Sequence, residues 1–584
     1  MREVSTAPLA DLSAYRNVTD LLMRRVDDAP EHVAFDVREG AGWRPVTTAE
    51  FAAEVRAVAK GLLADGLRPG DAVAIMAPTR YEWAVADLAV WFAGGVVVPV
   101  YDSSAPSQVA AIVADAGVRV AFFGDERSKA ALTAAGVPVV LALTRGLARL
   151  AARGVIVDDA ALERARTDAG PSSPATIVYT SGTSGTPKGV VLSHENFLGQ
   201  VLNIAAAYSD IVRADGSTVI FLPLAHVLAR GLQLICLASG MRIAHLSEPS
   251  EVVASLAELR PTFLVVVPRI LEKIAAAAGA KAADKRLGRV WVAAVRTATE
   301  LARREEQIDD GQTPASSWSL QLRRRVFDAL FYRRIRALMG GRIGYVLSGG
   351  ATLPSRLSLL FRGMGIPVIE GYGLTETTAP LTGNLPGRIR SGTVGVPLPG
   401  STVRIADDGE VLAKGVGVFA GYRDPDDDRD AFVDGFFRTG DLGRLDERGR
   451  LVLEGRVKDV VTTSGGKTVA PARWEAAIEE HPVISSAVTV GEGRPYLTAL
   501  IVLDQDAVTA ARGGAVALDD PDLRAEVQRA VDAANALVSR SEQVRRFALV
   551  FADAEDREIV TPTLKIRRRQ LLDRESRTID ALYL

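Results

Sequence analysis

Amphipathic stretches alternate with short apolar runs between residues 45 and 270, and this alternation constrains the fold more than any other feature of the sequence. The segment 48–65 has the apolar spacing of a helix with one buried face. The runs between such segments are rich in β-branched residues and comprise 72–76, 96–100, 118–123, 219–222 and 263–267. Strands that alternate with helices in this way form a parallel sheet. We therefore predict an α/β fold.

The pattern changes in the second half of the chain. Residues 280–346 have few β-branched runs and many arginines, including Arg323–Arg325 and Arg333–Arg334. This composition favours helices with a solvated, charged face. Beyond about residue 390, turns separate short runs that indicate a small, mainly β region, namely 392–396, 409–412 and 449–453. The acidic run 424–430 is expected to form a surface loop.

We divide the chain into two domains at this change of pattern. Residues 1–455 are expected to form a large N-terminal domain of parallel-sheet α/β subdomains plus the small β region. Residues 456–584 are expected to form a small α+β C-terminal domain. Within it, Pro471 marks the start of one helix and residues 521–540 form another.

Composition argues against several classes of protein. The 69 basic and 71 acidic residues nearly cancel to a formal charge of −2, so a nucleic-acid partner is not expected. The single cysteine, Cys236, cannot form an internal disulfide, and the five histidines show no zinc-ligand spacing. We expect no secretory signal and a reducing, cytoplasmic location.

One apolar stretch, 83–100, invites a membrane interpretation. Asp87, Gly94-Gly95 and Pro99 interrupt it, whereas a spanning helix needs about 20 uninterrupted apolar residues. We predict a buried helix at 82–92, a glycine turn, and a strand at 96–100.

A loop of small and hydroxyl residues lies between two β-branched runs, at 177–192. Backbone N–H groups of small residues can approach an anion closely, hydroxyls add donors, and a lysine adds a point charge. These residues are Thr180, Ser181, Gly182, Thr183, Ser184, Gly185, Thr186 and Lys188. The loop is not a Walker A motif, because Pro187 and Gly189 flank the lysine. A plain hairpin turn would not need so many small residues.

These residues resemble the phosphate loop of the adenylate-forming, AMP-binding enzymes, whose members include acyl-CoA synthetases, peptide-synthetase adenylation domains and luciferases. Further segments match in the family's order, namely 222–226 (LPLAH), 348–351 (SGGA), 370–376 (EGYGLTE), 437–441 (FRTGD), 455–459 (GRVKD) and 562–567 (PTLKIR). Together with 179–189 (YTSGTSGTPKG) they span most of the chain. One departure is Phe436-Phe437, where the family commonly has tryptophan before an aromatic residue.

The resemblance implies an ATP site with Mg²⁺. The glycine-rich loop would hold the β- and γ-phosphates, and Glu376 and Thr180 would hold the metal. The family's adenine- and ribose-binding positions correspond here to Gly350, Ala351, Glu370, Gly371, Tyr372, Gly373, Thr375, Asp441 and Arg456. From the residues alone, Glu376 could equally cap a helix and Tyr372 could be a core residue.

The resemblance also implies a mobile C-terminal domain that carries the catalytic Lys565. That lysine would bridge the carboxylate and the α-phosphate, although by itself it reads as part of a solvated basic patch. Lys458 matches the hinge. The segment Ser464, Gly465 and Gly466 would face CoA, and His226 would lie beside the acyl carboxylate or be a core histidine.

The subgroup that the chain most resembles is the bacterial long-chain acyl-CoA synthetases, which use ATP, Mg²⁺ and CoA. The resemblance rests on the long insertion before residue 345 and on segments 100–104 and 224–230, with Arg230 near the acyl-tunnel gate. The alternatives are an acyl-AMP ligase that loads a carrier protein, an aryl or short-chain acid–CoA ligase, and a non-catalytic fatty-acid-binding protein. Contact of the basic 280–346 helices with a membrane, and a homodimer, remain open.

Overall fold

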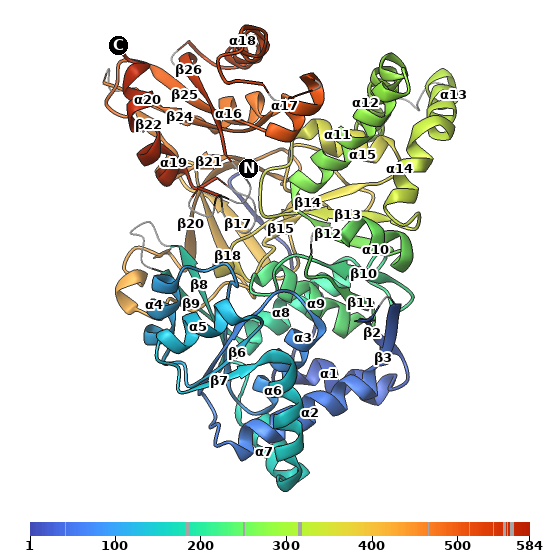
Figure 1. The fold of residues 1–584 in the computed structure, drawn as a ribbon, viewed down its shortest axis with the longest axis vertical. Coiled ribbons are helices and arrows are strands. Elements are labelled where there is room, and N and C mark those ends of the chain that lie inside the picture. The colour runs from blue at the N-terminus through green and yellow to red at the C-terminus, as the bar shows by residue number, and fades with distance from the viewer. Residues whose placement is uncertain are drawn as a thin grey trace.

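The computed structural model describes residues 1–584 except Ala41, 182–186, 249–250, 313–317, 465–466, 513, 515, 541, 553–555, 557–558 and 561–565. The first helices lie at one end of the molecule and the last 130 or so residues at the other, with the sheets between them (Figure 1). The architecture is α/β with mixed sheets, as predicted, and has a large N-terminal part followed by a smaller C-terminal part.

One six-stranded sheet carries the glycine-rich loop. Its order is β7-β6-β4-β5-β8-β9, and all neighbours are parallel except the β8–β9 hairpin. The strands are β4 (Ala72–Met76), β5 (Val96–Val100), β6 (Val120–Phe123), β7 (Val139–Ala142), β8 (Pro174–Ser181) and β9 (Pro187–Ser193). The predicted runs 72–76 and 96–100 are confirmed, and the run 118–123 begins two residues later than predicted.

A nine-stranded sheet lies beside it, in the order β16-β15-β14-β13-β12-β10-β11-β2-β3. Its central strands, from β14 to β2, run parallel. The strands are β2 (Val33–Glu39), β3 (Gly42–Thr47), β10 (Ser217–Ile220), β11 (Arg242–His245), β12 (Phe263–Val266), β13 (Tyr345–Ser348), β14 (Val368–Tyr372), β15 (Thr382–Gly383) and β16 (Val396–Pro397). Buried side chains of these strands point alternately to the two faces of the sheet, and helices pack on both faces.

Helices cover these two sheets. The helix predicted at 48–65 is α2 (Thr48–Ala64), which starts with a capping box in which the Thr47 hydroxyl and the Glu50 carboxylate each accept a backbone N–H. The others are α1 (Thr19–Asp28), α4 (Pro106–Ala116), α5 (Glu126–Ala134), α6 (Leu143–Arg153), α7 (Asp159–Asp168), α8 (His194–Ala207), α9 (Val227–Ser239), α10 (Val252–Leu259) and α15 (Ser355–Gly363).

The apolar stretch 83–100 is a buried helix, α3 (Tyr81–Phe92), followed by a turn and β5, as predicted. Nearly every side chain of α3 is buried, Asp87 included. Within the described parts of the chain, no helix combines the length and the apolar composition that crossing a bilayer requires.

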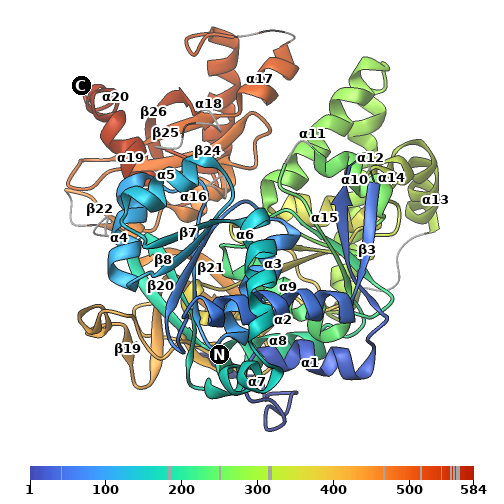
Figure 2. The ribbon, with the colours of Figure 1, turned by 60° about the horizontal axis from the view of Figure 1, so that its bottom comes forward.

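The insertion at 280–346 is helical, as predicted. It follows α11 (Pro268–Asp284) and contains α12 (Gly288–Asp309), α13 (Trp318–Phe327), a π-helical turn η3 (Asp328–Tyr332) and α14 (Arg333–Leu338). These elements form a lobe beside the nine-stranded sheet (Figures 1 and 2).

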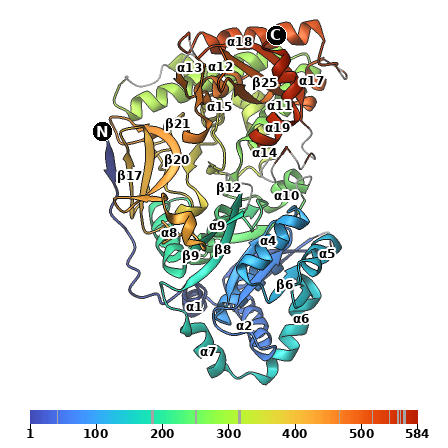
Figure 3. The ribbon, with the colours of Figure 1, turned by 90° about the vertical axis from the view of Figure 1, so that its left-hand side faces the viewer.

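The small β region forms a sheet in the order β1-β17-β18-β20-β19, with β21 paired to β20. The N-terminal strand β1 lies along β17 (Figure 3). Bounds are β1 (Glu3–Ser5), β17 (Ser401–Ile405), β18 (Glu410–Gly415), β19 (Phe432–Val433), β20 (Phe436–Leu445) and β21 (Leu451–Arg456). The prediction of a strand at 392–396 was wrong, because Gly392 and Gly395 have positive φ angles of 83° and 76° and only Val396 joins a strand.

The last part of the chain has buried apolar clusters of its own. Within the described residues, these clusters join Val461 through Ile579 and include no residue before Val461. Its elements are β22 (Val461–Thr462), β23 (Thr468–Val469), α16 (Ala472–Ile478), β24 (Ile484–Val490), β25 (Leu497–Leu503), α17 (Gln505–Arg512), α18 (Pro521–Asn535), β26 (Val544–Phe551), α19 (Arg568–Arg574) and α20 (Ser576–Ala581). The helix expected to begin at Pro471 is α16, and the helix expected over 521–540 ends at Asn535.

Candidate active site

The β8–β9 hairpin brings Thr180 opposite Lys188 in the strand register. The turn between them, Gly182 to Thr186, and the side chain of Ser181 lie outside the described residues. The Lys188 ammonium forms an ion pair with Asp427, Nζ to Oδ1 2.8 Å, and lies 5.3 Å from the ring centre of Tyr422. Both partners of the ion pair are a little over a quarter exposed. The lysine therefore reaches the open side of the hairpin, where a ligand could replace Asp427.

Tyr422 connects this hairpin to Glu376. Its hydroxyl donates a hydrogen bond of 3.0 Å to Oε1 of Glu376, and its backbone pairs with Val190 of β9. Glu376 lies in a short 3₁₀ turn, η4 (Thr375–Thr377), and burial raises the pKa of its carboxyl. Arg456 lowers that pKa and Asp441 raises it, so these charges act on the same carboxyl group. One oxygen of Glu376 is held by Tyr422, which positions the carboxyl.

A second set of contacts joins Tyr372, Asp441 and Arg456. The Tyr372 hydroxyl donates to Oδ2 of Asp441 at 2.7 Å, and Nε of Arg456 lies 3.0 Å from Oδ1 of the same carboxylate. Asp441 on β20 lies opposite Arg456 on β21, while Tyr372 ends β14. Burial raises the pKa of Tyr372 well above its usual value, so the tyrosine keeps its proton and remains a donor.

The neighbouring positions of the 370–376 segment differ in accessibility. Gly350 and Ala351 are exposed just after β13. Gly373 packs on the Ala379–Pro380 segment so closely that a Cβ would lie 2.8 Å from Pro380 Cα, which explains why glycine follows Tyr372. Gly371 pairs with Gly383 of β15, and Thr375 opens η4.

The Glu370 side chain is buried near Ser358, Gly392 and Glu306. It is 5% exposed, and Oε1 has no hydrogen-bond partner among the described residues. Burial raises the pKa of Glu370 to about 8, the backbone of Gly392 and the hydroxyl of Ser358 lower it, and the charge of Glu306 raises it.

His226 caps the start of α9. Its Nδ1 accepts a hydrogen bond from the backbone N–H of Leu228 at 3.2 Å, and the ring is half-buried. The tautomer is fixed by this bond, because Nδ1 acts as the acceptor. The next two turns of α9 contribute to a pocket.

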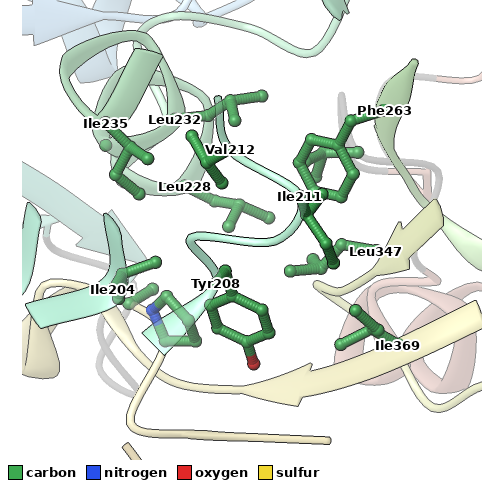
Figure 4. Close-up of a pocket in the computed structure, with 14 residues that line it drawn as sticks. Ile204, Tyr208, Ile211, Val212, Leu228, Leu232, Ile235, Phe263, Leu347 and Ile369 are labelled. Atoms are coloured by element: carbon green, nitrogen blue, oxygen red, sulfur yellow. The ribbon is translucent and has the colours of Figure 1, made fainter. Parts of the chain in front are cut away.

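That pocket has a lining that is almost entirely apolar (Figure 4). It lies between α9, the segment after α8, and the faces of β12, β13 and β14. Its lining residues are Ile204, Tyr208, Ile211, Val212, Leu228, Gly231, Leu232, Ile235, Phe263, Val265, Leu347, Ile369, Ala379 and Pro380. The free volume is about 40 Å³, small against the roughly 300–1,000 Å³ of typical ligand pockets. Lining side chains must therefore move before a chain-like ligand can enter.

Arg230, which was expected near the gate of an acyl tunnel, is a core residue in this structure. Its side chain is 1% exposed and forms a two-point ion pair with Asp87, Nε to Oδ2 2.8 Å and Nη2 to Oδ1 2.5 Å. Nη1 donates to the hydroxyl of Thr176 at 2.7 Å, and Arg230 is absent from the pocket lining. The arginine points into the core because Asp87 on α3 would otherwise be a buried, unpaired charge.

Beyond Arg456, which contacts Asp441, no contact between described residues brings the predicted residues of the C-terminal part to these groups. Lys458 is exposed in a 3₁₀ turn, η6 (Val457–Asp459). The backbone N–H of Ser464 donates to the carbonyl of Arg494 at 2.9 Å. Gly465, Gly466 and Lys565 lie outside the described residues.

Sequence reasoning missed Tyr422 and Asp427. The acidic run was expected to be only a surface loop, yet its 3₁₀ turn η5 (Pro425–Asp428) presents Asp427 to Lys188, and Asp428 accepts the backbone N–H of Tyr422 at 2.8 Å. The position of Tyr422 two residues before this acidic run is the one signal in the sequence that could have suggested a role.

Two family models match most of the chain. Residues 22–423 match the AMP-binding enzyme model, and residues 458–584 match the AMP-binding enzyme C-terminal domain. The chain belongs to the AMP-binding enzyme family. Family membership accounts for the order of the segments from the glycine-rich loop to the C-terminal tail, because these segments recur in that order among the adenylate-forming enzymes.

Relatives and solved structures agree with the assignment. The chain is 37% identical to the long-chain-fatty-acid–CoA ligase FadD15 of Mycobacterium bovis and to its counterpart in Mycobacterium tuberculosis, over 100% of each protein. Its fold is similar to ATP-bound MatB from Rhodopseudomonas palustris, with a TM-score of 0.70 and 25% identity over 96% of this chain and 99% of MatB. The o-succinylbenzoate CoA synthetase of Bacillus subtilis has the same fold, with a TM-score of 0.68 and 21% identity over 94% of this chain and 98% of that protein.

The described residues contain no group of three or more acidic, histidine or cysteine side chains that could hold a metal. Mg²⁺ in enzymes that act on nucleotides is commonly held by one or two carboxylates, water and the phosphates of the substrate. The half-buried carboxyl group of Glu376 fits a single protein ligand of that kind.

Proposed function

We propose that this protein is an ATP-dependent long-chain fatty acid–CoA ligase. It joins the carboxylate of a fatty acid to the α-phosphate of ATP, which releases pyrophosphate and gives an acyl-adenylate. The thiol of CoA then attacks the acyl carbon, loses its proton, and releases AMP as the thioester forms. The full-length identity to long-chain-fatty-acid–CoA ligases supports the reaction.

The observation that carries the substrate class is the lining of the pocket behind His226. The 14 lining residues include no charged side chain, which suits a hydrocarbon chain and gives no partner for the ammonium group of an amino acid. Leu228, which lines the pocket, is the residue whose N–H holds His226. We propose that the acid places its carboxylate near His226 and its chain along α9.

The proposed nucleotide-binding roles follow from two sets of contacts: those around Lys188 and Glu376, and those that join Tyr372, Asp441 and Arg456. We propose that Lys188 and the glycine-rich loop bind the β- and γ-phosphates after Lys188 leaves Asp427. Tyr372, Asp441 and Arg456 bind the nucleoside, with the Asp441 carboxylate accepting from the ribose. Glu376 and Thr180 would hold Mg²⁺, which neutralises phosphate charge when bound. Lys565 would bring a cation between the two anions as they react.

The two-domain division, with residues 1–455 and 456–584 hinged near Lys458, also remains our proposal. The separate apolar clusters of the last part support it, as does the exposed position of Lys458. A hinge needs a few residues at the end of an element that can absorb a change in φ and ψ. Rotation about Lys458 would replace Lys565 at the site by the segment Ser464–Gly466, where CoA would react.

The test is an assay with ATP, CoA and palmitate that follows AMP and palmitoyl-CoA. AMP and palmitoyl-CoA should form together. When CoA is left out, neither should form at a rate comparable to that of the complete reaction. Release of acyl-AMP with no thioester, or transfer only to an acyl carrier protein, would favour the acyl-AMP ligase. A pyrophosphate-exchange screen with fatty, aromatic, short-chain and amino acids identifies an aryl or short-chain ligase. Absence of exchange with every acid would overturn the proposal.

A further inference from the structure

The helix α13 presents an apolar stripe that the protein itself does not cover. Trp318 is 79% exposed, Leu322 52% and Val326 51%. Side chains spaced four apart lie on one face of a helix, so these three form a continuous row. Leu330, in the π-helical turn that follows, is 40% exposed and extends the row.

The other face of this segment anchors it to the lobe. Leu320 is 1% exposed, and the ring of Phe331 packs edge-on against Trp291 of α12 with 5.5 Å between ring centres. The Tyr332 hydroxyl donates to the carbonyl of Ala294 at 2.6 Å. Because these contacts fix α13 from the inner side, the outer stripe is not needed to hold the helix in place.

Exposed arginines lie in α13 and at the start of the following helix, α14. Arg325 is exposed one turn from Leu322, and Arg333 and Arg334 are exposed at the start of α14. Within the described residues these three have no ion-pair partner, whereas Arg323 lies 3.6 Å from Glu300. The chain as a whole carries a formal charge of −2, so this positive patch is a local feature. Apolar side chains next to unpaired cations match the chemistry of a bilayer surface with anionic headgroups.

We propose that the surface formed by α13 and the start of α14, defined by Trp318, Leu322, Val326, Arg325, Arg333 and Arg334, docks on an anionic lipid surface. The helix lies parallel to the surface, with its apolar row among the acyl chains and its arginines on the phosphates. It lies at the outer edge of the lobe in two views, which leaves it room to meet a flat surface (Figures 1 and 2). The proposal goes beyond the proposed function and does not require it.

The experiment is flotation of the full-length protein with vesicles of phosphatidylcholine alone or of equal parts phosphatidylcholine and phosphatidylglycerol. The wild type should bind the anionic vesicles, and more weakly in high salt. The triple variant W318S/L322S/V326S should lose at least tenfold in binding. R325Q/R333Q/R334Q should lose about fivefold per arginine, and only on anionic vesicles.

The matched control is V155S/I156S, which removes two apolar side chains that are each 81% exposed on a different part of the surface. Its binding should equal that of the wild type within twofold. Acyl-CoA synthesis without vesicles should be unchanged in all three variants. This activity assay distinguishes failure of the proposed function from failure of the proposed lipid docking. Three outcomes would each overturn the proposal. The first is that the wild type shows no binding to anionic vesicles, and the second is that the control loses as much binding as W318S/L322S/V326S. The third is that the wild type does not bind vesicles but self-associates, and that W318S/L322S/V326S abolishes this self-association.

Discussion

The protein contains two ion pairs of the same general kind, a basic side chain with an aspartate: Arg230 with Asp87, and Lys188 with Asp427. They differ in burial and in the number of hydrogen bonds that the basic side chain makes. Arg230 and Asp87 are 1% and 0% exposed, and the arginine has a hydrogen bond from each of its three nitrogens. Lys188 and Asp427 are each 28% exposed, and the lysine has one ion-pair contact at 2.8 Å. The first pair is closed to solvent and therefore to a ligand, whereas the second is partly exposed, and under the proposed function a phosphate would replace its carboxylate.

Burial and pairing distinguish a charge that stabilises the core from a charge that can take part in binding, and they do so more clearly than residue type. Asp87 lies in an apolar helix and Arg230 follows a family segment, so the sequence gives the arginine the more functional appearance. Its position in the core contradicts that interpretation. A charge available for chemistry should cost activity when it is removed, and a charge committed to the core should cost stability.

The largest effect should follow removal of Lys565. If this lysine bridges the two reacting anions, Lys565→Ala should lower acyl-adenylate formation about a thousandfold, since a charge that stabilises the transition state is lost. Nucleotide affinity should change little. The measurement is pyrophosphate exchange with palmitate, beside AMP binding by calorimetry.

Arg569→Ala is the control for this variant, because Arg569 is exposed in the same basic segment. It should keep activity within twofold. The Lys565→Ala protein should still make acyl-CoA from supplied acyl-adenylate, as the lysine serves only the first step. Undiminished turnover from the free acid would contradict the assignment of Lys565.

Arg230→Met should have the largest effect on stability. It leaves Asp87 buried without a partner, which typically costs about 3–5 kcal/mol. Burial raises the pKa of Asp87 and Arg230 lowers it, so without the arginine the carboxyl should take up a proton. Denaturant unfolding measures the loss, and the double variant Asp87→Leu/Arg230→Met should recover much of it.

Lys188→Met completes the comparison. Breaking this partly exposed pair should change stability by less than about 1 kcal/mol, yet it should raise the KM for ATP. If Lys188→Met destabilised the protein as much as Arg230→Met, the distinction between the two pairs would fail.

The same contrast explains what the sequence could and could not predict. The strands at 72–76 and 96–100 were predicted correctly because their β-branched runs determine them locally. Asp87 and Arg230 are 143 residues apart, and Lys188 pairs with a residue far along the chain. Periodicity does not encode which distant charges meet, so neither pair could be inferred before the fold was known. Glu370 was found by its motif, but the direction of its side chain depends on α12 and α15.

Glu370 sharpens the comparison, because it is buried and forms no ion pair with any residue that the structure describes. Its folded pKa of about 8 exceeds its usual value of 4.5, so the native state binds the extra proton and loses stability as pH rises from about 4.5 to 8. Glu370→Gln should remove that loss, which amounts to roughly 5 kcal/mol at most. Unfolding at pH 5 and pH 9 should show a gain over wild type only at the higher pH.

Glu410→Gln is the matched control for this pH dependence. Glu410 is 3% exposed but forms an ion pair with Arg438, at 2.6 Å between Oε2 and Nη2. Removing its charge should therefore lower stability at both pH values. A pH-independent effect of Glu370→Gln would show that Glu370 does not hold a proton in the folded state.

The smallest expected effect tests whether Asp427 competes with the nucleotide for Lys188. Asp427→Asn removes the partner that Lys188 must leave before it can bind phosphate. A partly exposed pair is worth about 1 kcal/mol at most, so the KM for ATP should fall by up to about fivefold while kcat stays within twofold. Asp430→Asn makes the same change of charge in the same acidic run, at an exposed position, and should leave the KM nearly unchanged. Equal effects of the two variants would mean that ATP senses the net charge of the run, and the pairing seen at Lys188 would then have no part in nucleotide binding.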